Sequence, residues 1–153
     1  MNISKADNLE TTVLSLNDVY KSFDGKPVLK GVNLTLNKGS VMGLLGENGS
    51  GKTTLLKTAL GLLRADLGET LVFTDDSWNM SENSKQRLGY VAQTLDCFHW
   101  MNEQELFTYT GAFYQNWDAK KVEALANKMH FDTTQRISNM SEGQRQQTSI
   151  IQA

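Results

Sequence analysis

The chain has one cysteine, Cys97, and one proline, Pro27, in 153 residues, a length of about one domain. A single cysteine excludes an internal disulfide and favours a reducing, cytosolic compartment. A single proline leaves little room for rigid linkers. No apolar run approaches the roughly 20 residues of a membrane-spanning helix, and residues 1–10 lack the apolar centre of a signal peptide. If the protein acts at a membrane, we expect it to do so through a partner.

The sequence also lacks an excess of positive charge. Its net charge is −2 and it contains no run of lysine or arginine, so we expect no nucleic-acid partner. His99 and His130, even taken together with Cys97, are too few and too scattered for a zinc site.

Residues 46–53 read Gly-Glu-Asn-Gly-Ser-Gly-Lys-Thr, which fits the phosphate-loop pattern G-x-x-x-x-G-K-[ST]. Glycines in such a loop let main-chain N–H groups point at phosphate oxygens, and the helix that follows adds the positive end of its dipole. Lys52 is expected to reach the β- and γ-phosphates, and the Thr53 hydroxyl to coordinate Mg²⁺. The alternative is a glycine turn without function. The predicted nucleotide contacts here are Gly46, Glu47, Asn48, Gly49, Ser50, Gly51, Lys52, Thr53 and Thr54.

The segments around this loop have the hydrophobic patterns of strands. Thr12–Val19 alternates and predicts an exposed edge strand, and Val32–Leu36 alternates and is expected to pair with it antiparallel. Residues 23–27, with Asp-Gly and a proline, supply turn chemistry between them. Val41–Leu45 is almost entirely apolar and predicts a strand covered on both faces.

Helical patterns follow the loop and dominate the second half. Lys52–Leu63 predicts a helix whose inward residues are Leu56, Ala59, Leu60 and Leu63. Thr70–Thr74 and Gly89–Ala92 are strand candidates, separated by a polar loop at Asp75–Lys85. From Asn102 onward the period predicts two helices, the second with Asp118 as its N-cap, in a lobe inserted between Gln93 and Ser141.

A second feature is Ser141-Glu142-Gly143-Gln144. Its structural interpretation is a capping box, in which Ser141 and Gln144 satisfy each other's backbone N–H groups at the start of a last helix. Such a helix end, with a glycine in its first turn, is also suited to an anion. The sequence therefore holds two helix N-termini that could receive phosphate.

With these features in this order, the chain resembles the ATP-binding domain of an ABC transporter over residues 14–153. The resemblance implies an α/β fold: a P-loop ABC-type ATPase core with an N-terminal antiparallel β segment and an inserted helical lobe, with its C-terminal part missing. It divides the chain into residues 1–93 (β segment and phosphate-loop core), 94–140 (helical lobe) and 141–153 (signature helix).

The resemblance also assigns roles to single residues. Phe23 matches the family's adenine-stacking aromatic; Tyr20 is the second candidate, and a core aromatic is the structural alternative for either. Gln93 matches the catalytic glutamine that touches Mg²⁺ and the attacking water. Met140–Gln144, the signature segment, resembles Leu-Ser-Gly-Gly-Gln, with Met140 in place of Leu and Glu142 in place of the first Gly. The residues expected to contact nucleotide there are Ser141, Gly143 and Gln144.

The partners and cofactors follow from the same resemblance. ATP and Mg²⁺ are the expected cofactors, and a second ABC ATP-binding domain is expected to face the first, so that each signature segment closes on the other's nucleotide. Permease subunits would hold the pair peripherally at the inner face of the cell membrane. Residues 113–118 resemble a stretch of exporter-type members and favour export. The aromatics between Phe98 and Trp117 are expected to pack the helical lobe or to meet the membrane subunit, and Trp78, Trp100 and Trp117 to be packing or partner contacts.

The family's acidic strand end, its catalytic glutamate and its histidine switch have no match in these 153 residues. We therefore expect a fragment that binds ATP weakly and hydrolyses it negligibly, because phosphoryl transfer needs an oriented nucleophile. Two alternatives are a soluble ABC-type ATPase acting on ribosomes or DNA, and a nucleotide-binding module that never hydrolyses. A P-loop kinase would leave Ser141–Gln144 unexplained.

Overall fold

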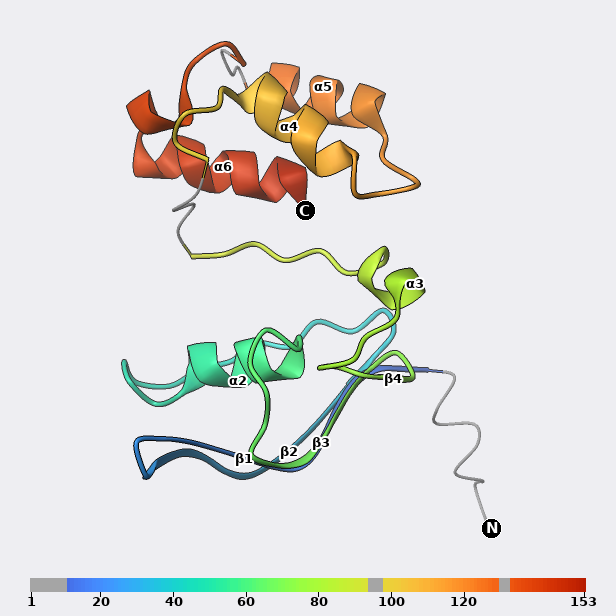
Figure 1. Ribbon diagram of the computed structural model, residues 1–153, viewed down its shortest axis with the longest axis vertical. Helices are drawn as coiled ribbons and strands as arrows, with labels where there is room; N and C mark the ends of the chain where they lie inside the picture. Colours follow the sequence, from blue (N-terminus) through green and yellow to red (C-terminus); the bar gives the residue numbers. More distant parts are fainter. Residues whose placement is uncertain (1–10, 94–97, 130–132) are drawn as a thin grey trace. The chain divides into compact units, whose positions relative to one another are not determined.

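The computed structural model describes residues 11–93, 98–129 and 133–153. The chain forms two compact units, residues 1–85 and residues 86–153 (Figure 1). The division expected from the sequence, with boundaries after residues 93 and 140, stays a prediction.

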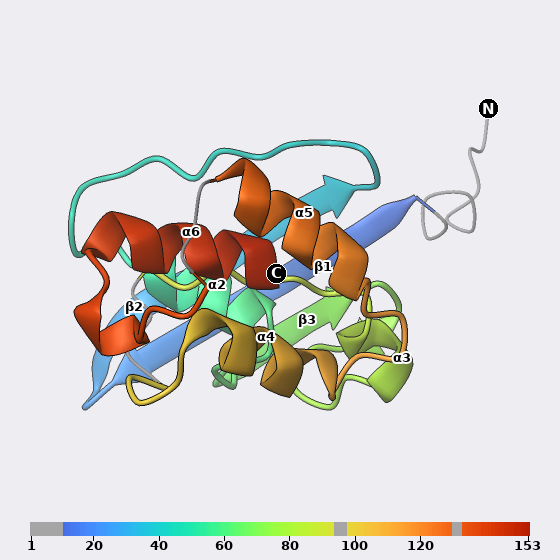
Figure 2. The ribbon, with the colours of Figure 1, turned by 90° about the horizontal axis from the view of Figure 1, so that it is seen from above.

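The first unit contains a four-stranded sheet in the order β2-β1-β3-β4, with every neighbouring pair antiparallel. The strands are β1 Thr12–Phe23, β2 Lys26–Asn37, β3 Leu67–Val72 and β4 Asp75–Asp76. Figure 2 shows β2, β1 and β3 side by side. The predicted antiparallel pair is confirmed, but the prediction of β1 as an edge strand is wrong. β3 pairs with the side of β1 that faces away from β2. Alternation within β1 alone does not indicate a partner strand that lies far away in the sequence.

A two-residue turn joins β1 to β2. Asp24 and Gly25 have φ values of 49° and 75°, and Phe23 pairs with Lys26 across the turn. Positive φ at both central residues is the type I′ geometry, whose twist matches that of the flanking strands. The turn predicted from Asp-Gly is confirmed.

Helix α2, Lys52–Ala59, packs on the sheet of the first unit. The unit's core consists of Leu16, Val19, Leu29, Leu55 and Ala59. The prediction of a helix through Leu63 is wrong, because Gly61 at φ 70° ends it. The N–H groups of Gly61 and Leu62 bond back to the carbonyls of Thr58 and Lys57 at 3.2 and 2.8 Å, which is a Schellman cap.

The inward face of α2 also differs from the predicted one. Leu55 is buried and Leu56 is 49% exposed, because the side facing Leu16 and Leu29 runs through Leu55 and Ala59. Apolar spacing alone fits either leucine, and the position of the sheet decides between them.

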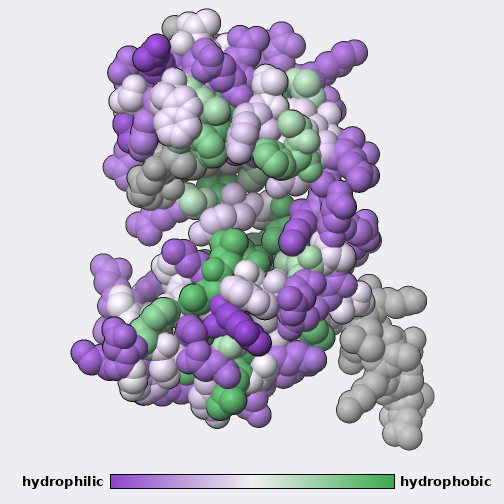
Figure 3. Space-filling view, in the orientation of Figure 1, coloured by the Kyte–Doolittle hydropathy of each residue, from purple (hydrophilic) through white to green (hydrophobic). Residues whose placement is uncertain are grey.

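Three further predictions, for segments between residues 41 and 92, are wrong. Val41–Leu45 is not a strand, and Val41 and Leu45 are 100% and 94% exposed. Gly89–Ala92 is not a strand either. A strand needs hydrogen-bonding neighbours, and no strand in the described residues pairs with either segment. Asp75–Lys85 is not only loop, because it contains β4 and the short helix α3, Glu82–Lys85. Figure 3 shows apolar side chains among polar ones on the visible surface.

The helices described in the second unit are α4 Glu103–Gly111, α5 Ala119–Lys128, a 3₁₀ turn η1 Ile137–Asn139, and α6 Glu142–Gln152. All three α-helices contact one another. Asp118 accepts a 3.0 Å hydrogen bond from the N–H of Lys121 and caps α5, as predicted. Trp117 packs beside a core of Phe107, Ala126 and Ile151. Within the described residues no helix is long and apolar enough to cross a bilayer.

Candidate functional site

The phosphate loop, residues 46–53, lies between residue 45 and the body of α2 and is largely exposed. Gly49 and Gly51 have φ values of 83° and 92°, a region that residues with a Cβ rarely adopt. The N–H of Ser50 bonds to the carbonyl of Glu47 at 3.2 Å and forms a turn inside the loop. The backbone therefore has the conformation that the glycines in the motif were expected to allow.

Lys52 connects the two ends of this loop. Its Nζ donates hydrogen bonds to the carbonyl oxygens of Gly46 and Glu47 at 2.7 and 2.6 Å. An ammonium has three donors, so two of them hold the loop closed and the third is left for a further acceptor. The ammonium is thus held against the backbone at the start of the loop.

The start of α2 is suited to an anion. Gly51 is its N-cap in a left-handed conformation, no side chain caps it, and its first turn contains no acidic residue. The first helical bond runs from the N–H of Leu55 to the carbonyl of Gly51 at 2.8 Å. The N–H groups of Lys52, Thr53 and Thr54 are left without an intrahelical acceptor and carry the positive end of the dipole.

Gly51 also lies against the hairpin that carries Phe23. A Cβ built on Gly51 would be 3.0 Å from Cγ1 of Val28 in β2. Phe23 is 44% exposed at the end of β1, one residue before the turn. Tyr20 is 41% exposed and its hydroxyl covers Gly31 of β2. The structure brings the aromatic pair and the phosphate loop into one unit, and the choice between Phe23 and Tyr20 for adenine stays a prediction.

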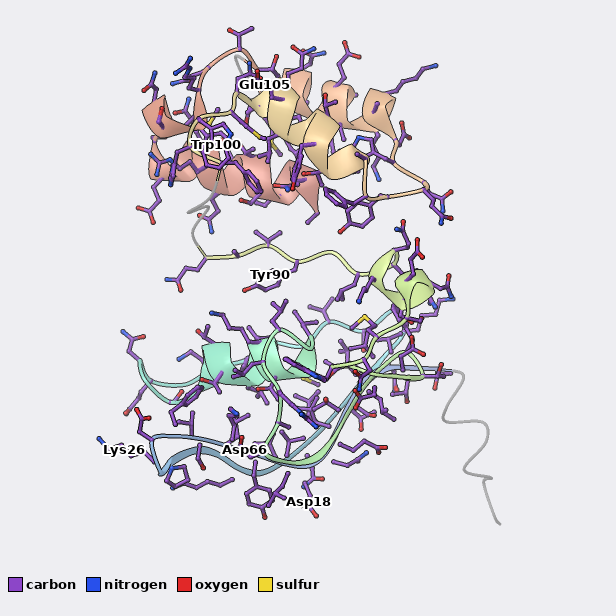
Figure 4. The ribbon with its side chains drawn as sticks, in the orientation of Figure 1. Asp18, Lys26, Asp66, Tyr90, Trp100 and Glu105 are labelled. Atoms are coloured by element: carbon purple, nitrogen blue, oxygen red, sulfur yellow. The ribbon has the colours of Figure 1, made fainter. Side chains whose placement is uncertain are left out.

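Asp66, labelled in Figure 4, fixes the end of β1 that leads into Phe23. Its carboxylate accepts hydrogen bonds from Lys21 Nζ at 2.6 Å and from the N–H of Ser22 at 2.7 Å. The hydrogen bond from Lys21 is the main reason that the pKa of Asp66 lies below its usual range. Lys21 Nζ also lies 5.6 Å from the centroid of the Phe23 ring, within cation–π distance. Sequence reasoning missed Asp66, since it lies 45 residues from Lys21 without a local signal.

The remaining predicted site residues lie in the second unit. Gln93 is exposed in a bend at the end of a described segment. The predicted capping box is confirmed: Ser141 Oγ accepts from the N–H of Gln144 at 3.3 Å, and Gln144 Oε1 accepts from the N–H of Ser141 at 2.9 Å. A Cβ built on Gly143 would meet no atom within 4 Å, and Glu142 is exposed in the first turn of α6. The joint action of Gln93, the signature segment and the phosphate loop stays a prediction.

Arg145 stabilises the η1 turn, which comes directly before the signature segment. Its Nε and Nη2 donate to the carbonyls of Ile137 and Ser138 at 3.2 and 3.3 Å. The same turn is tied to the residues before α4, because the N–H of Ile137 donates to the carbonyl of Met101 at 2.9 Å. The start of α6 is therefore anchored to the start of α4.

Comparison with known proteins identifies the class. The ABC transporter family model matches residues 29–153, a range that contains both the phosphate loop and the signature segment. The chain therefore belongs to the ABC transporter family, as an ATP-binding domain. The described fold is accordingly part of a P-loop ABC-type ATPase fold, and the predicted fold class is confirmed.

Individual relatives agree with this assignment. The chain is 30% identical to the ABC transporter ATP-binding protein YtrB of Bacillus subtilis, over 91% of this chain and 47% of that protein. It is 33% identical to the ergothioneine transport ATP-binding protein EgtV of Helicobacter pylori, over 91% of this chain and 68% of that protein. Proteins named for spermidine/putrescine import and methionine import also match. The chain spans about half the length of YtrB.

The fold has solved counterparts. An ATP-binding subunit of an ABC transporter superposes with a TM-score of 0.83 over 93% of this chain and 61% of that chain, at 20% sequence identity. At that identity the likeness supports the fold alone.

Proposed function

We propose that residues 46–54 bind the phosphates of ATP. One observation carries this proposal: Lys52 is hydrogen-bonded to the loop that leads into α2. The N-terminus of α2 has no side-chain cap and no acidic residue in its first turn. Three free N–H groups and an ammonium offer both hydrogen bonds and positive charge to a triphosphate. Phe23 would stack on the adenine, with Lys21 and Asp66 holding its strand end.

Mg²⁺ fits the same arrangement. The exposed Thr53, in the first turn of α2, offers a hydroxyl as a hard oxygen ligand beside the N–H groups that would hold the phosphates. Gln93 as a further ligand stays a prediction from the family resemblance. When bound, Mg²⁺ neutralises phosphate charge. This chain's own groups hold and orient the triphosphate through Lys52 and the loop N–H groups.

The signature segment is proposed to meet a different nucleotide, the one held by a partner ATP-binding domain. The N–H groups of Glu142 and Gly143 precede the first intrahelical bond of α6, and Gly143 leaves them sterically open. ATP would then bridge two positively polarised helix ends from two subunits, and loss of the γ-phosphate would remove the bridge.

For the whole protein we propose an ATP-binding subunit that hydrolyses ATP and drives transport through permease subunits at the membrane. The 153 residues by themselves are expected to bind ATP weakly and to hydrolyse it negligibly. Export remains our prediction from residues 113–118, and the relatives named for import leave the direction to experiment.

Complementation between two variants tests the shared site. Lys52→Ala removes the cation of the loop. Gly143→Asp places a carboxylate in open space at the start of α6, where it suits the helix dipole and leaves the fold intact. Neither variant alone should associate with Mg·ATP in sedimentation experiments. Their mixture should associate, because one of its two sites carries no substitution. A mixture that associates no better than each variant alone would contradict the shared site.

A further inference from the structure

A buried carboxylate joins α4 to the signature helix. Glu103 is in the first turn of α4 and is 0% exposed, and Thr148 of α6 is also 0% exposed. The Thr148 hydroxyl donates a hydrogen bond to Oε1 of Glu103. Buried carboxylates are costly unless they are hydrogen-bonded, so this contact constrains both helices. Figure 4 marks the first turn of α4 by Glu105, the partner of Asn102 in its capping box.

The same hydroxyl touches the signature segment. Thr148 Oγ1 lies 3.0 Å from the carbonyl oxygen of Gln144 and 4.0 Å from the sulfur of Met140. A threonine hydroxyl has one proton, so its donation to Glu103 competes with a hydrogen bond to the Gln144 carbonyl. Glu103 therefore competes with the Gln144 carbonyl for that proton and limits the back-bonding that tends to bend a helix.

The packing on either side joins the same elements. Leu106 and Phe107 follow Glu103 at the i+3 and i+4 positions, on the same face of α4. Leu106 packs with Ile137 and Met140, and Phe107 packs with Ile151 of α6. Two apolar clusters thus connect α4 with the signature segment or its helix, as the Glu103–Thr148 hydrogen bond does.

We infer that Glu103 is a positioning residue for the signature segment. Glu103 accepts a hydrogen bond from Thr148. Thr148 in turn contacts the sulfur of Met140 and the carbonyl of Gln144, which are the two ends of the signature segment. The open N–H groups of Glu142 and Gly143 are thereby fixed in place for a partner's nucleotide. This inference rests on the proposed function, in which the segment receives that nucleotide.

Hydrogen–deuterium exchange at residues 141–147 tests the positioning directly. Glu103→Leu and Thr148→Val should each speed exchange there by about tenfold, as expected for losing one buried hydrogen bond. Glu103→Gln keeps an acceptor oxygen and should restore exchange to within about twofold of the unsubstituted rate. The double variant Glu103→Leu/Thr148→Val should be no faster than either single one.

Thr110→Val is the matched control, because Thr110 accepts a 2.7 Å hydrogen bond from Gln152 at the other end of the α4–α6 contact. It should leave exchange at residues 141–147 unchanged. Equal acceleration throughout the second unit in Glu103→Leu and Thr110→Val, or exchange in Glu103→Leu like that of the unsubstituted chain, would overturn the inference.

ATP-dependent association separates the inference from the proposed function. Glu103→Leu should weaken association while ATP affinity at the phosphate loop stays the same. Faster local exchange with unchanged association would leave the positioning intact and contradict the shared site instead.

Discussion

Lys52 Nζ lies 2.7 Å from the carbonyl oxygen of Gly46, so the lysine that begins α2 closes the loop that precedes it. This contact fixes the position of the Lys52 charge relative to the loop. A preplaced cation next to free N–H groups loses less side-chain entropy on binding than a mobile one would.

Gly51→Ala should weaken both the fold and nucleotide binding. An alanine at φ 92° is strained by about 1 kcal/mol or more, and its Cβ would be 3.0 Å from Val28. Gly39→Ala is the matched control, because Gly39 has φ 77° with no atom within 4 Å and lies outside the loop. The melting temperature should fall for both variants, whereas ATP affinity should fall only for Gly51→Ala. Equal loss of ATP affinity in the two variants would contradict the assignment of the loop.

Asp66→Ala should lower ATP affinity several-fold without touching the phosphate loop. It releases Lys21 and Ser22, and with them the strand end that carries Phe23. Asp75→Ala is the control, since its carboxylate binds Ser81 in the same unit. Titration with a fluorescent ATP analogue measures the difference. If Asp66→Ala and Asp75→Ala bind alike, Phe23 is not the adenine platform.

The stability of the first unit should fall in acid. Hydrogen bonds from Lys21 and from the N–H of Ser22 lower the pKa of Asp66, and hydrogen bonds from Ser81 lower the pKa of Asp75. A lowered folded-state pKa gives stability that is present above the unfolded value and is lost as pH falls through the folded one, here below about pH 4. The melting-temperature difference between the unsubstituted chain and Asp66→Asn should therefore shrink below that pH. A difference that stays constant down to pH 3 would contradict this origin.

Two capping boxes permit a comparison within the second unit. Ser141→Ala and Asn102→Ala each remove an N-cap and should each cost about 1 kcal/mol of stability. Only Ser141→Ala should weaken ATP-dependent association, because only α6 begins with the signature segment. Equal effects of the two variants on association would mean that Ser141 acts through stability alone.

Local signals in the sequence were reliable where the chemistry is local. The Asp24–Gly25 turn, the Asp118 cap and the Ser141 capping box each depend on residues within four positions of one another. The choice of Leu55 over Leu56 as the inward leucine, and the central place of β1, depend on strands far along the chain. Val41–Leu45 shows the same limit, since apolar composition predicts burial only when a neighbouring strand exists.

The same reasoning applies to the candidate site. The motif is enough to predict the loop residues, because its glycines and lysine lie within eight positions of one another. Asp66 is 45 residues from Lys21, and Glu103 is 45 residues from Thr148. No local spacing rule predicts contacts at that separation.

The central claim is that Lys52 and the start of α2 hold the phosphates of ATP. Calorimetric titration of Mg·ATP into the unsubstituted chain, Lys52→Ala and Lys57→Ala tests it most directly, since Lys57 is an exposed lysine in the last turn of the same helix. Lys52→Ala should weaken binding by about tenfold or more, as expected for losing a charged hydrogen-bond donor, and Lys57→Ala should bind like the unsubstituted chain. Unchanged affinity in Lys52→Ala would contradict the account.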